Sequence, residues 1–167
     1  DGGGTNVLRG GAGNDILTGT DNWGINTFEG GTGNDTMSGN WGGDTYLFNL
    51  GDGQDTISDN GSYSSAGQYA DVLRFGVGIN QDQVAFQRTG DDLNFAVGGL
   101  DDQVVVKNWY KGNGANKIES VVFGDGSVLT SGQIDSLIAA MASSSGHSLE
   151  PSFTPLLPQS TISLTHT

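Results

Sequence analysis

GGAGNDILT at residues 10–18 and GGTGNDTMS at residues 30–38 are two copies of one nine-residue pattern. The pattern reads G-G-x-G-x-D-x-U-x, where U is a large apolar residue, and four looser copies surround these two. Such a repeat predicts a six-residue glycine-rich turn followed by a three-residue strand, with two repeats in each coil of about 18 residues. The predicted fold class is therefore all-β, a right-handed parallel β-roll, which is a form of β-solenoid.

The copies keep one register along residues 1–60. An acidic or amide residue recurs in steps of 9 or 11 residues, and a large apolar residue follows it two places later. The first series is Asn6, Asp15, Asn26, Asp35, Asp44 and Asp55, and the second is Leu8, Leu17, Phe28, Met37, Tyr46 and Ile57. Because repeats alternate between two sides of the coil, every second turn should stack. The predicted columns are Asp15, Asp35 and Asp55 on one side, and Asn6, Asn26 and Asp44 on the other.

These turns have the composition of a calcium site. Calcium takes six to eight oxygen ligands at about 2.3–2.6 Å, from carboxylates and backbone carbonyls. Glycine permits positive φ, so several carbonyls of one turn can point at the same place. We predict about four calcium ions. The predicted side-chain ligands are Asp15, Asp35, Asp44 and Asp55, with Asp1, Asp21, Asn26, Asp52 and Asp59 as less secure candidates. The predicted carbonyl ligands belong to Gly10, Ala12, Asn14, Gly30, Thr32 and Asn34.

The second column carries asparagine where the pattern has aspartate. In the turns DGGGTN (1–6) and DNWGIN (21–26), aspartate stands at the first position and asparagine at the sixth. One hypothesis is that Asp1 and Asp21 supply the carboxylates that Asn6 and Asn26 cannot. The alternative is a decayed site that holds no ion.

The same column contains a second repeat, NWGINTF (22–28) against NWGGDTY (40–46). It places Trp23 and Trp41 at equivalent positions of neighbouring turns, about 4.8 Å apart if the strands pair normally. The two indoles are either a packing ladder or an exposed platform for a glycan.

The composition restricts the possible partners. The chain has 19 acidic and 6 basic residues and a pI near 4.1, which disfavours nucleic acid because phosphate binding depends on Lys and Arg. The absence of cysteine excludes thiol catalysis and Cys-based zinc sites, and it fits a chain that stays unfolded until export. No stretch approaches the roughly 20 apolar residues of a membrane span. Because the sequence opens inside a repeat, we expect more of the parent polypeptide before Asp1.

The character of the sequence changes after residue 60. We predict a β-roll over 1–60, a β-rich flanking module over 61–129, a helix over 130–142 and a Ser/Thr/Pro tail over 143–167. The expected strands lie in DVLRF (71–75), VAFQRT (84–89), LNFAV (93–97), QVVVKNWY (103–110), KIESVVF (117–123) and SVL (127–129).

The expected helix opens with Thr130 and Gln133 in capping-box spacing. One face of it carries Ile134, Leu137, Ile138 and Met141.

Nothing in the sequence indicates an enzyme. No G-x-S-x-G or H-E-x-x-H motif is present, and both histidines, His147 and His166, lie in the tail. The acidic pairs Asp91–Asp92 and Asp101–Asp102 fall in expected hairpin turns, where aspartate is common.

Residues 1–142 resemble the C-terminal part of RTX (repeats-in-toxin) proteins, the haemolysin-type calcium-binding family. GGDTYLFNLGDGQDTISDN (42–60) resembles the last repeat of that family. The segments LRFGVGINQDQVAFQR, DDLNFAV, DQVVVKNWY and KIESVVFGDG are similar to its flanking module, and QIDSLIAAMA resembles the end of the capping segment in adenylate cyclase toxin-type proteins.

This resemblance implies export from a Gram-negative bacterium by a type I (ABC transporter) system that reads an uncleaved C-terminal signal. The implied location is extracellular or at the cell surface, with folding on calcium binding outside the cell. The parent would be a toxin, adhesin or exoenzyme, and the implied partners are the secretion machinery and the rest of that polypeptide. A calcium-dependent adhesive or carbohydrate-binding module is the alternative.

Overall fold

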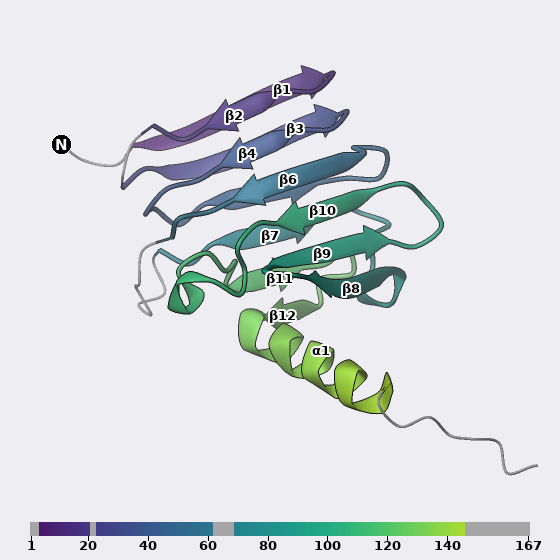
Figure 1. The fold of residues 1–167 in the computed structure, drawn as a ribbon. Coiled ribbons are helices and arrows are strands. Elements are labelled where there is room, and N and C mark those ends of the chain that lie inside the picture. The colour runs from purple at the N-terminus through teal and green to yellow at the C-terminus, as the bar shows by residue number, and fades with distance from the viewer. Residues whose placement is uncertain (1–3, 21–22, 62–68, 146–167) are drawn as a thin grey trace, which may run out of the picture.

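The computed structural model describes residues 4–20, 23–61 and 69–145. In these ranges the protein is mostly β-structure, with two six-stranded sheets packed face to face and one α-helix at the end (Figure 1). The first sheet contains, in spatial order, β1 (Thr5–Ala12), β3 (Ile25–Thr32), β5 (Thr45–Phe48), β7 (Val72–Phe75), β11 (Ser120–Val122) and β12 (Val128–Thr130). The second contains β2 (Ile16–Thr18), β4 (Thr36–Ser38), β6 (Gln54–Ser58), β10 (Gln103–Val106), β9 (Asp92–Val97) and β8 (Val84–Thr89).

The repeats form the upper part of both sheets in Figure 1. Successive strands alternate between the sheets, so β1, β3 and β5 pair in parallel in one sheet while β2, β4 and β6 do so in the other. Leu8 lies opposite Phe28, and Phe28 lies opposite Tyr46. The apolar series of the sequence therefore has the register that the sequence predicts.

The predicted strand length of three residues is wrong for four of the six repeats, since β5 has four residues, β6 has five, and β1 and β3 depart furthest. β2 and β4 have three residues, but β1 and β3 have eight. The longer strands continue into the glycine turn, where Gly11 still pairs with Gly31. Because glycine has no side chain to separate neighbouring coils, parallel pairing persists through the first half of the turn.

The residues after 60 extend the same two sheets. β7 adds in parallel to β5, and β10 adds in parallel to β6. The pairing then becomes antiparallel, with β9 and β8 beyond β10 and with β12 beyond β11. Each of the six expected segments overlaps one strand, although β9 begins one residue before its segment and β12 ends one residue after its own. The division of the chain into a roll and a flanking module stays a prediction, since both sheets run continuously through that boundary.

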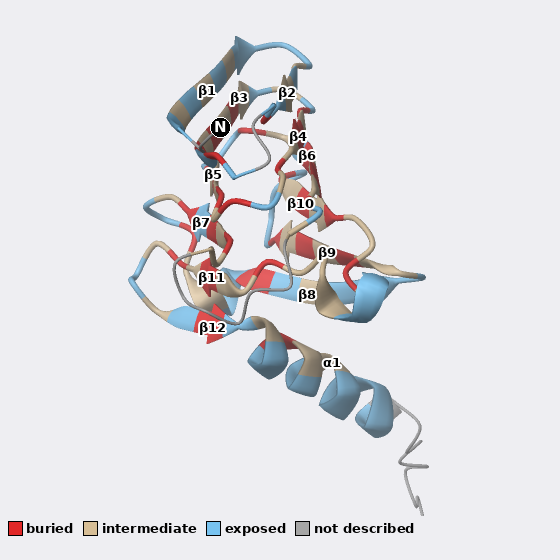
Figure 2. Cartoon of the chain, turned by 90° about the vertical axis from the view of Figure 1, so that its left-hand side faces the viewer, coloured by how far each residue is buried: buried red, intermediate tan, exposed pale blue. Residues whose placement is uncertain are grey.

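A single apolar core fills the space between the sheets. Figure 2 shows buried residues along the inner faces from β3 onward, whereas β1 and β2 are mostly exposed or intermediate. Phe28 and Tyr46 stack at 5.1 Å between ring centroids, and Phe75 and Phe123 stack at 5.6 Å. At the β1–β2 end, Leu8 is only partly buried because it has a neighbouring coil on one side alone.

Helix α1 (Ser131–Ser145) follows β12 and is attached through its first turns. Ile134 is fully buried, and Asp135 accepts a hydrogen bond from Trp109 Nε1 at 2.8 Å. Leu137 and Met141, which the sequence places on the same helix face as Ile134, are 41% and 48% exposed. The helix leaves the sheets after its first half, so only its N-terminal apolar residues find a partner. In the described part of the chain, no helix has the length and hydrophobicity needed to cross a bilayer.

The capping box predicted from the sequence is present. The backbone N–H of Thr130 donates to Gln133 Oε1 at 2.8 Å, and the N–H of Gln133 lies 3.4 Å from Thr130 Oγ1. Thr130→Ala is expected to lower the free energy of unfolding by about 1 kcal/mol, since it leaves a helix N–H unsatisfied. Urea denaturation at saturating calcium measures this. Ser136→Ala, on the exposed side of the same helix, serves as the control and should stay within about 0.5 kcal/mol; equal effects of both changes would contradict the capping role.

Candidate metal centre

The first predicted column exists as a stack of carboxylates. The backbone N–H of Asp15 donates to Asp35 Oδ1 at 2.7 Å, and the N–H of Asp35 donates to Asp55 Oδ1 at 2.9 Å. Asp35 and Asp55 thus each use one carboxylate oxygen to hold the turn of the neighbouring coil. Asp35 and Asp55 are almost completely buried.

The second oxygen of each of these carboxylates has no partner. The Oδ2 atoms of Asp15, Asp35 and Asp55 are buried and accept no hydrogen bond among the described residues. An unsatisfied buried acceptor costs about 1–3 kcal/mol, and more when it is charged. A bound cation removes that cost, so this row of oxygens fits the metal that the sequence predicts.

The glycines of the turn leave room for such an ion. A Cβ built on Gly10 would lie 2.6 Å from Asp15 Oδ2 and 2.6 Å from the carbonyl oxygen of Gly30. Asp15 Oδ2 and the Gly30 carbonyl oxygen, both predicted ligands, are therefore separated by at most twice 2.6 Å. Two oxygens that bind one calcium ion, each at about 2.3–2.6 Å from it, are likewise separated by at most twice that metal–oxygen distance. A Cβ on Gly30 would lie only 2.3 Å from Asp35 Oδ2.

The other predicted carbonyl donors lie in the same stacked turns. The carbonyl of Thr32 accepts the N–H of Gly13 at 2.8 Å, and Ala12 pairs with Thr32 between β1 and β3. The side chains of Asn14 and Asn34 form a ladder, in which Asn14 Oδ1 accepts the N–H of Asn34 at 2.9 Å. Since a carbonyl oxygen has two lone pairs, these contacts leave the carbonyls able to bind calcium. Their role as ligands stays a prediction.

The second column is built differently in its first two levels. Asn6 Nδ2 donates to Asn26 Oδ1 at 3.0 Å, and Asn26 Nδ2 donates to Asp44 Oδ1 at 2.9 Å. These amide hydrogen bonds join the levels of the second column, and the decayed-site alternative stays a hypothesis. Asp1 and Asp21 lie outside the described residues, so the compensation hypothesis stays a hypothesis.

Asp52 and Asp59 are both buried but have different surroundings. Asp52 Oδ2 accepts the N–H of Asn49 at 2.7 Å, so this carboxylate holds its own turn together. Asp59 Oδ2 accepts the hydroxyl of Tyr46 at 2.5 Å, while Asp59 Oδ1 has no described partner. A carboxylate oxygen of Asp59 also lies within 4.8 Å of one of Asp44 in the second column.

Three further acids that the sequence analysis did not select belong to the same stacks. Asp71 Oδ1 accepts the N–H of Asp44 at 2.7 Å, and Glu119 Oε2 accepts the N–H of Asp71 at 2.7 Å. Asp102 accepts the N–H of Gly51 at 2.7 Å and that of Gly53 at 3.2 Å. A signal for Asp71 exists, because DVL at 71–73 repeats the spacing of DTY at 44–46, but an inserted loop interrupts the period.

Burial changes the acidity of these carboxyl groups. It raises the pKa of Asp55 and of Asp59 to about 7, and that of Asp71 to about 9, with neighbouring negative charges adding to the rise. Burial also raises the pKa of Asp44 and of Asp52. Without a cation, the fold therefore favours the protonated acids.

These shifts predict how the calcium-free protein responds to pH. A carboxyl whose pKa rises on folding from about 4 makes the folded state bind protons more tightly. Folding stability then falls as the pH rises through the interval between the two values. We expect metal-stripped protein to show more β-structure by circular dichroism at pH 5 than at pH 8. At millimolar calcium the order should reverse, because protons compete with the metal. A metal-stripped sample that gains β-signal from pH 5 to pH 8 would contradict this.

The paired tryptophans lie side by side, as the second repeat predicts. The ring centroids of Trp23 and Trp41 are 5.4 Å apart with an interplanar angle of 76°, and Tyr69 lies 6.0 Å from Trp23. Edge-to-face geometry is a favourable packing arrangement for aromatic rings. Both indoles are about half exposed, so the geometry is compatible with a packing ladder and with an exposed platform for a glycan.

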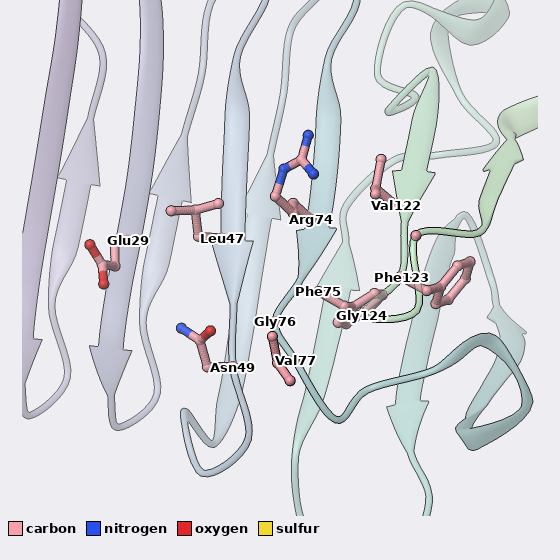
Figure 3. Close-up of a pocket in the computed structure, with 11 residues that line it drawn as sticks. Glu29, Leu47, Asn49, Arg74, Phe75, Gly76, Val77, Val122, Phe123 and Gly124 are labelled. Carbon is pink, nitrogen blue, oxygen red and sulfur yellow. The ribbon is translucent and has the colours of Figure 1, made fainter.

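A shallow groove of about 400 Å³ lies on the outer face of the first sheet (Figure 3). Glu29, Leu47 and Arg74 reach it from the neighbouring strands β3, β5 and β7. Glu29 also pairs with Arg9 at 2.8 Å. Since the aspartate stacks lie at the turns and the core, this groove is separate from them.

Comparison with known proteins agrees with the calcium chemistry of the turns. Residues 1–22 and 20–57 match the RTX calcium-binding nonapeptide repeat in four copies, and residues 92–133 match the haemolysin-type calcium binding protein related domain. Among solved structures, the extracellular lipase LipA from Serratia marcescens is 27% identical, with a TM-score of 0.37. That match covers 59% of this chain and 18% of the lipase. No curated protein matches the chain.

Proposed function

The chain carries RTX calcium-binding repeats followed by a haemolysin-type calcium-binding related domain, and we propose that it is the calcium-dependent folding module of a larger secreted protein. In this proposal residues 1–60 form a right-handed β-solenoid once calcium binds outside the cell. The module supports type I export of a toxin, adhesin or exoenzyme. RTX repeats are in general calcium-binding rather than catalytic elements, and the proposed function has no enzymatic step.

The observation that carries the proposal is the row of partnerless carboxylate oxygens at Asp15, Asp35 and Asp55. Three negative charges on one side of neighbouring coils oppose stacking, while the glycines beside them keep the space open. When bound, calcium supplies positive charge and accepts these oxygens as ligands. The residues themselves orient two of the carboxylates, because Oδ1 of Asp35 and Oδ1 of Asp55 are each fixed by the N–H of a neighbouring turn.

In this proposal the calcium concentration of the compartment decides whether the module folds. Extracellular calcium modules have dissociation constants of about 10⁻⁴–10⁻³ M. A ligand that binds only the folded state stabilises it in proportion to the logarithm of its concentration over that constant. At submicromolar cytosolic calcium this contribution is negligible, so the chain stays unfolded and transportable before export.

Calcium titration calorimetry on the full chain tests the binding part of the proposal. Asp35→Asn is expected to weaken calcium binding strongly, because it removes a carboxylate from the centre of the first column. Asp82→Asn is the matched control, since it makes the same charge change at an exposed position outside the column. Equal calcium binding by both variants would refute the assignment of this column.

The export part of the proposal depends on the C-terminus. The tail 143–167 lies largely outside the described residues, and its role as part of a secretion signal comes from the family resemblance. A passenger fused to the full chain should reach the medium of cells that carry a type I transporter. Deletion of residues 143–167 should reduce that export, and undiminished export would contradict the signal role.

A second candidate function is carbohydrate binding at the exposed aromatic cluster. Trp23 and Trp41 lie next to each other at the surface and are both about half exposed. A glycan array with and without calcium separates this candidate from the first. Binding that is lost in the Trp23→Ala/Trp41→Ala double variant, and retained in the exposed-site control Val77→Ala, would support it; no glycan signal for the unmodified chain would exclude it.

A further inference from the structure

One row of side chains crosses the outer face of the first sheet. The strand register places Arg9, Glu29, Leu47, Arg74 and Val122 opposite one another on β1, β3, β5, β7 and β11. Figure 3 shows the last four of these residues on neighbouring strands, where they line the groove. Because neighbouring strands lie about 4.8 Å apart, the row is about 19 Å long.

Arg74 differs from the other five basic side chains of the protein. Four of those five form an ion pair with an acid, and Arg88 lies 4.0 Å from the ring centroid of Tyr110. Arg74 is exposed and forms neither an ion pair nor a ring contact with any residue that the structure describes. Glu29, two strands away, binds Arg9 Nε through Oε2 at 2.8 Å, which leaves Oε1 available. The row therefore holds an open cation and an open acceptor oxygen on opposite sides of Leu47.

The rest of this face is uncharged or apolar. At the outward positions of the six described strands, the charged residues are Arg9, Glu29 and Arg74, which give a net charge of +1 in a chain whose net charge is −13. Exposed large apolar side chains lie on this face or in the turns beside it, namely Val7, Ile25, Leu50, Val77 and Val128. Exposed apolar surface that is contiguous and has a polar rim is typical of protein interaction sites.

The row is self-complementary about Leu47. A two-fold axis that runs along β5 through Leu47 places a second copy face to face with the first and reverses the order of its row. Glu29 of each copy then meets Arg74 of the other copy, and the two Leu47 side chains meet on the axis. Contacts of a two-fold dimer come in such reciprocal pairs. A two-fold axis across the strands would instead bring Arg74 against Arg74 and Glu29 against Glu29, and like charges in contact oppose association.

We propose that the outer face of the first sheet binds a second copy of this chain, with Glu29 and Arg74 as the reciprocal ion pairs and Leu47 at the centre. Sheets that pack face to face lie about 10 Å apart with strand directions within about 30° of each other. That separation suits one arginine and one glutamate that meet between the sheets. Six strands and their turns offer about 1,000 Å² from the two copies together, which is the size of a weak interface. The dimer should therefore dissociate on dilution.

Sedimentation equilibrium of the full chain at saturating calcium tests the interface. The unmodified chain should change from monomer to dimer between micromolar and millimolar concentration. Arg74→Glu and Glu29→Arg should each weaken this association by at least about tenfold, because each variant places like charges at both facing pairs. Lys111→Glu and Asp82→Arg are the matched controls, since they reverse the same charges at exposed positions outside the first sheet. Both controls should associate like the unmodified chain.

An equimolar mixture of the two interface variants is the sharpest test. Every facing pair in a mixed dimer again joins opposite charges, so the mixture of Arg74→Glu and Glu29→Arg chains should recover the association that each variant lacks alone. Circular dichroism shows whether both variants are folded. A dimer that persists in both variants, or a mixture of folded variants that stays monomeric, would overturn the inference.

Cross-linking tests the same contact if either charge variant does not fold. The chain contains no cysteine, so Leu47→Cys introduces a single thiol at the two-fold axis. A short bismaleimide should link Leu47→Cys chains into dimers, whereas Ile16→Cys, on the exposed face of the second sheet, should stay unlinked. Equal linking of the two variants would refute the assigned face. An unmodified chain that binds calcium but stays monomeric at millimolar concentration would overturn this inference and leave the proposed function intact.

Discussion

Transfer of the calcium-loaded chain into EGTA at pH 7.5 is expected to abolish most of its β-structure, measured as loss of the far-UV circular dichroism minimum near about 218 nm. Returning calcium should restore the spectrum. The change is expected to involve both the repeats and the strands that follow them, because β7 and β10 continue the sheets begun by the repeats.

The reason is the charge that the fold concentrates. Residues 1–60 contain nine acids and a single base, Arg9. Five aspartates among them, Asp35, Asp44, Asp52, Asp55 and Asp59, are buried. Burying a charged carboxylate without a cation costs several kcal/mol. Each occupied calcium site instead adds about 1.8 kcal/mol when free calcium is about 20 times the dissociation constant. Removing the metal therefore both withdraws that stabilisation and restores the repulsion.

Magnesium provides the control for ionic strength and valence. It demands near-octahedral geometry at about 2.0–2.1 Å and keeps several of its waters, so carbonyls and carboxylates of a stacked turn suit it poorly. An equal concentration of magnesium should leave the EGTA-treated chain unfolded. A chelated sample with an unchanged spectrum and melting temperature would refute calcium-dependent folding.

The part of the structure that the sequence predicts well is the part with strict spacing. The steps of 9 and 11 residues place Leu8, Phe28 and Tyr46 opposite one another, and the structure has that register. Asp15, Asp35 and Asp55 stack for the same reason. In a parallel coil, spacing along the chain translates directly into position across the sheet, so counting residues is sufficient.

The spacing of the repeats no longer predicts which residues stack once the chain leaves the repeats. Asp71 stands 27 positions after Asp44, and its side chain nevertheless accepts the N–H of Asp44. The length of an inserted loop does not affect which strands pair, so periodicity cannot find this residue. Helical spacing places Leu137 and Met141 on one face with Ile134, but it does not show how far the sheets extend beneath that face, and both side chains are exposed.

Replacing a turn glycine by alanine is expected to lower the stability of the fold by different amounts at two equivalent positions, because the surroundings of these positions differ. Gly11 and Gly31 occupy the second place of the same pattern, pair with each other between β1 and β3, and have φ of +108° and +97°. A Cβ on Gly31 would lie 1.9 Å from the carbonyl oxygen of Gly11. A Cβ on Gly11 would have no described atom within 4 Å outside its chain neighbours.

Gly31→Ala is therefore expected to destabilise the calcium-bound fold by about 2–5 kcal/mol, against about 1–2 kcal/mol for Gly11→Ala. Both variants force an L-residue into positive φ, which costs about 1–2 kcal/mol. Gly31→Ala alone must also push two coils apart, and overpacking of this kind adds about 1–3 kcal/mol. Urea denaturation at saturating calcium measures the difference, and the calcium midpoint of folding should rise more for Gly31→Ala. Equal losses in the two variants would show that neighbouring coils do not approach as closely as the Gly11 carbonyl and Gly31 Cα require.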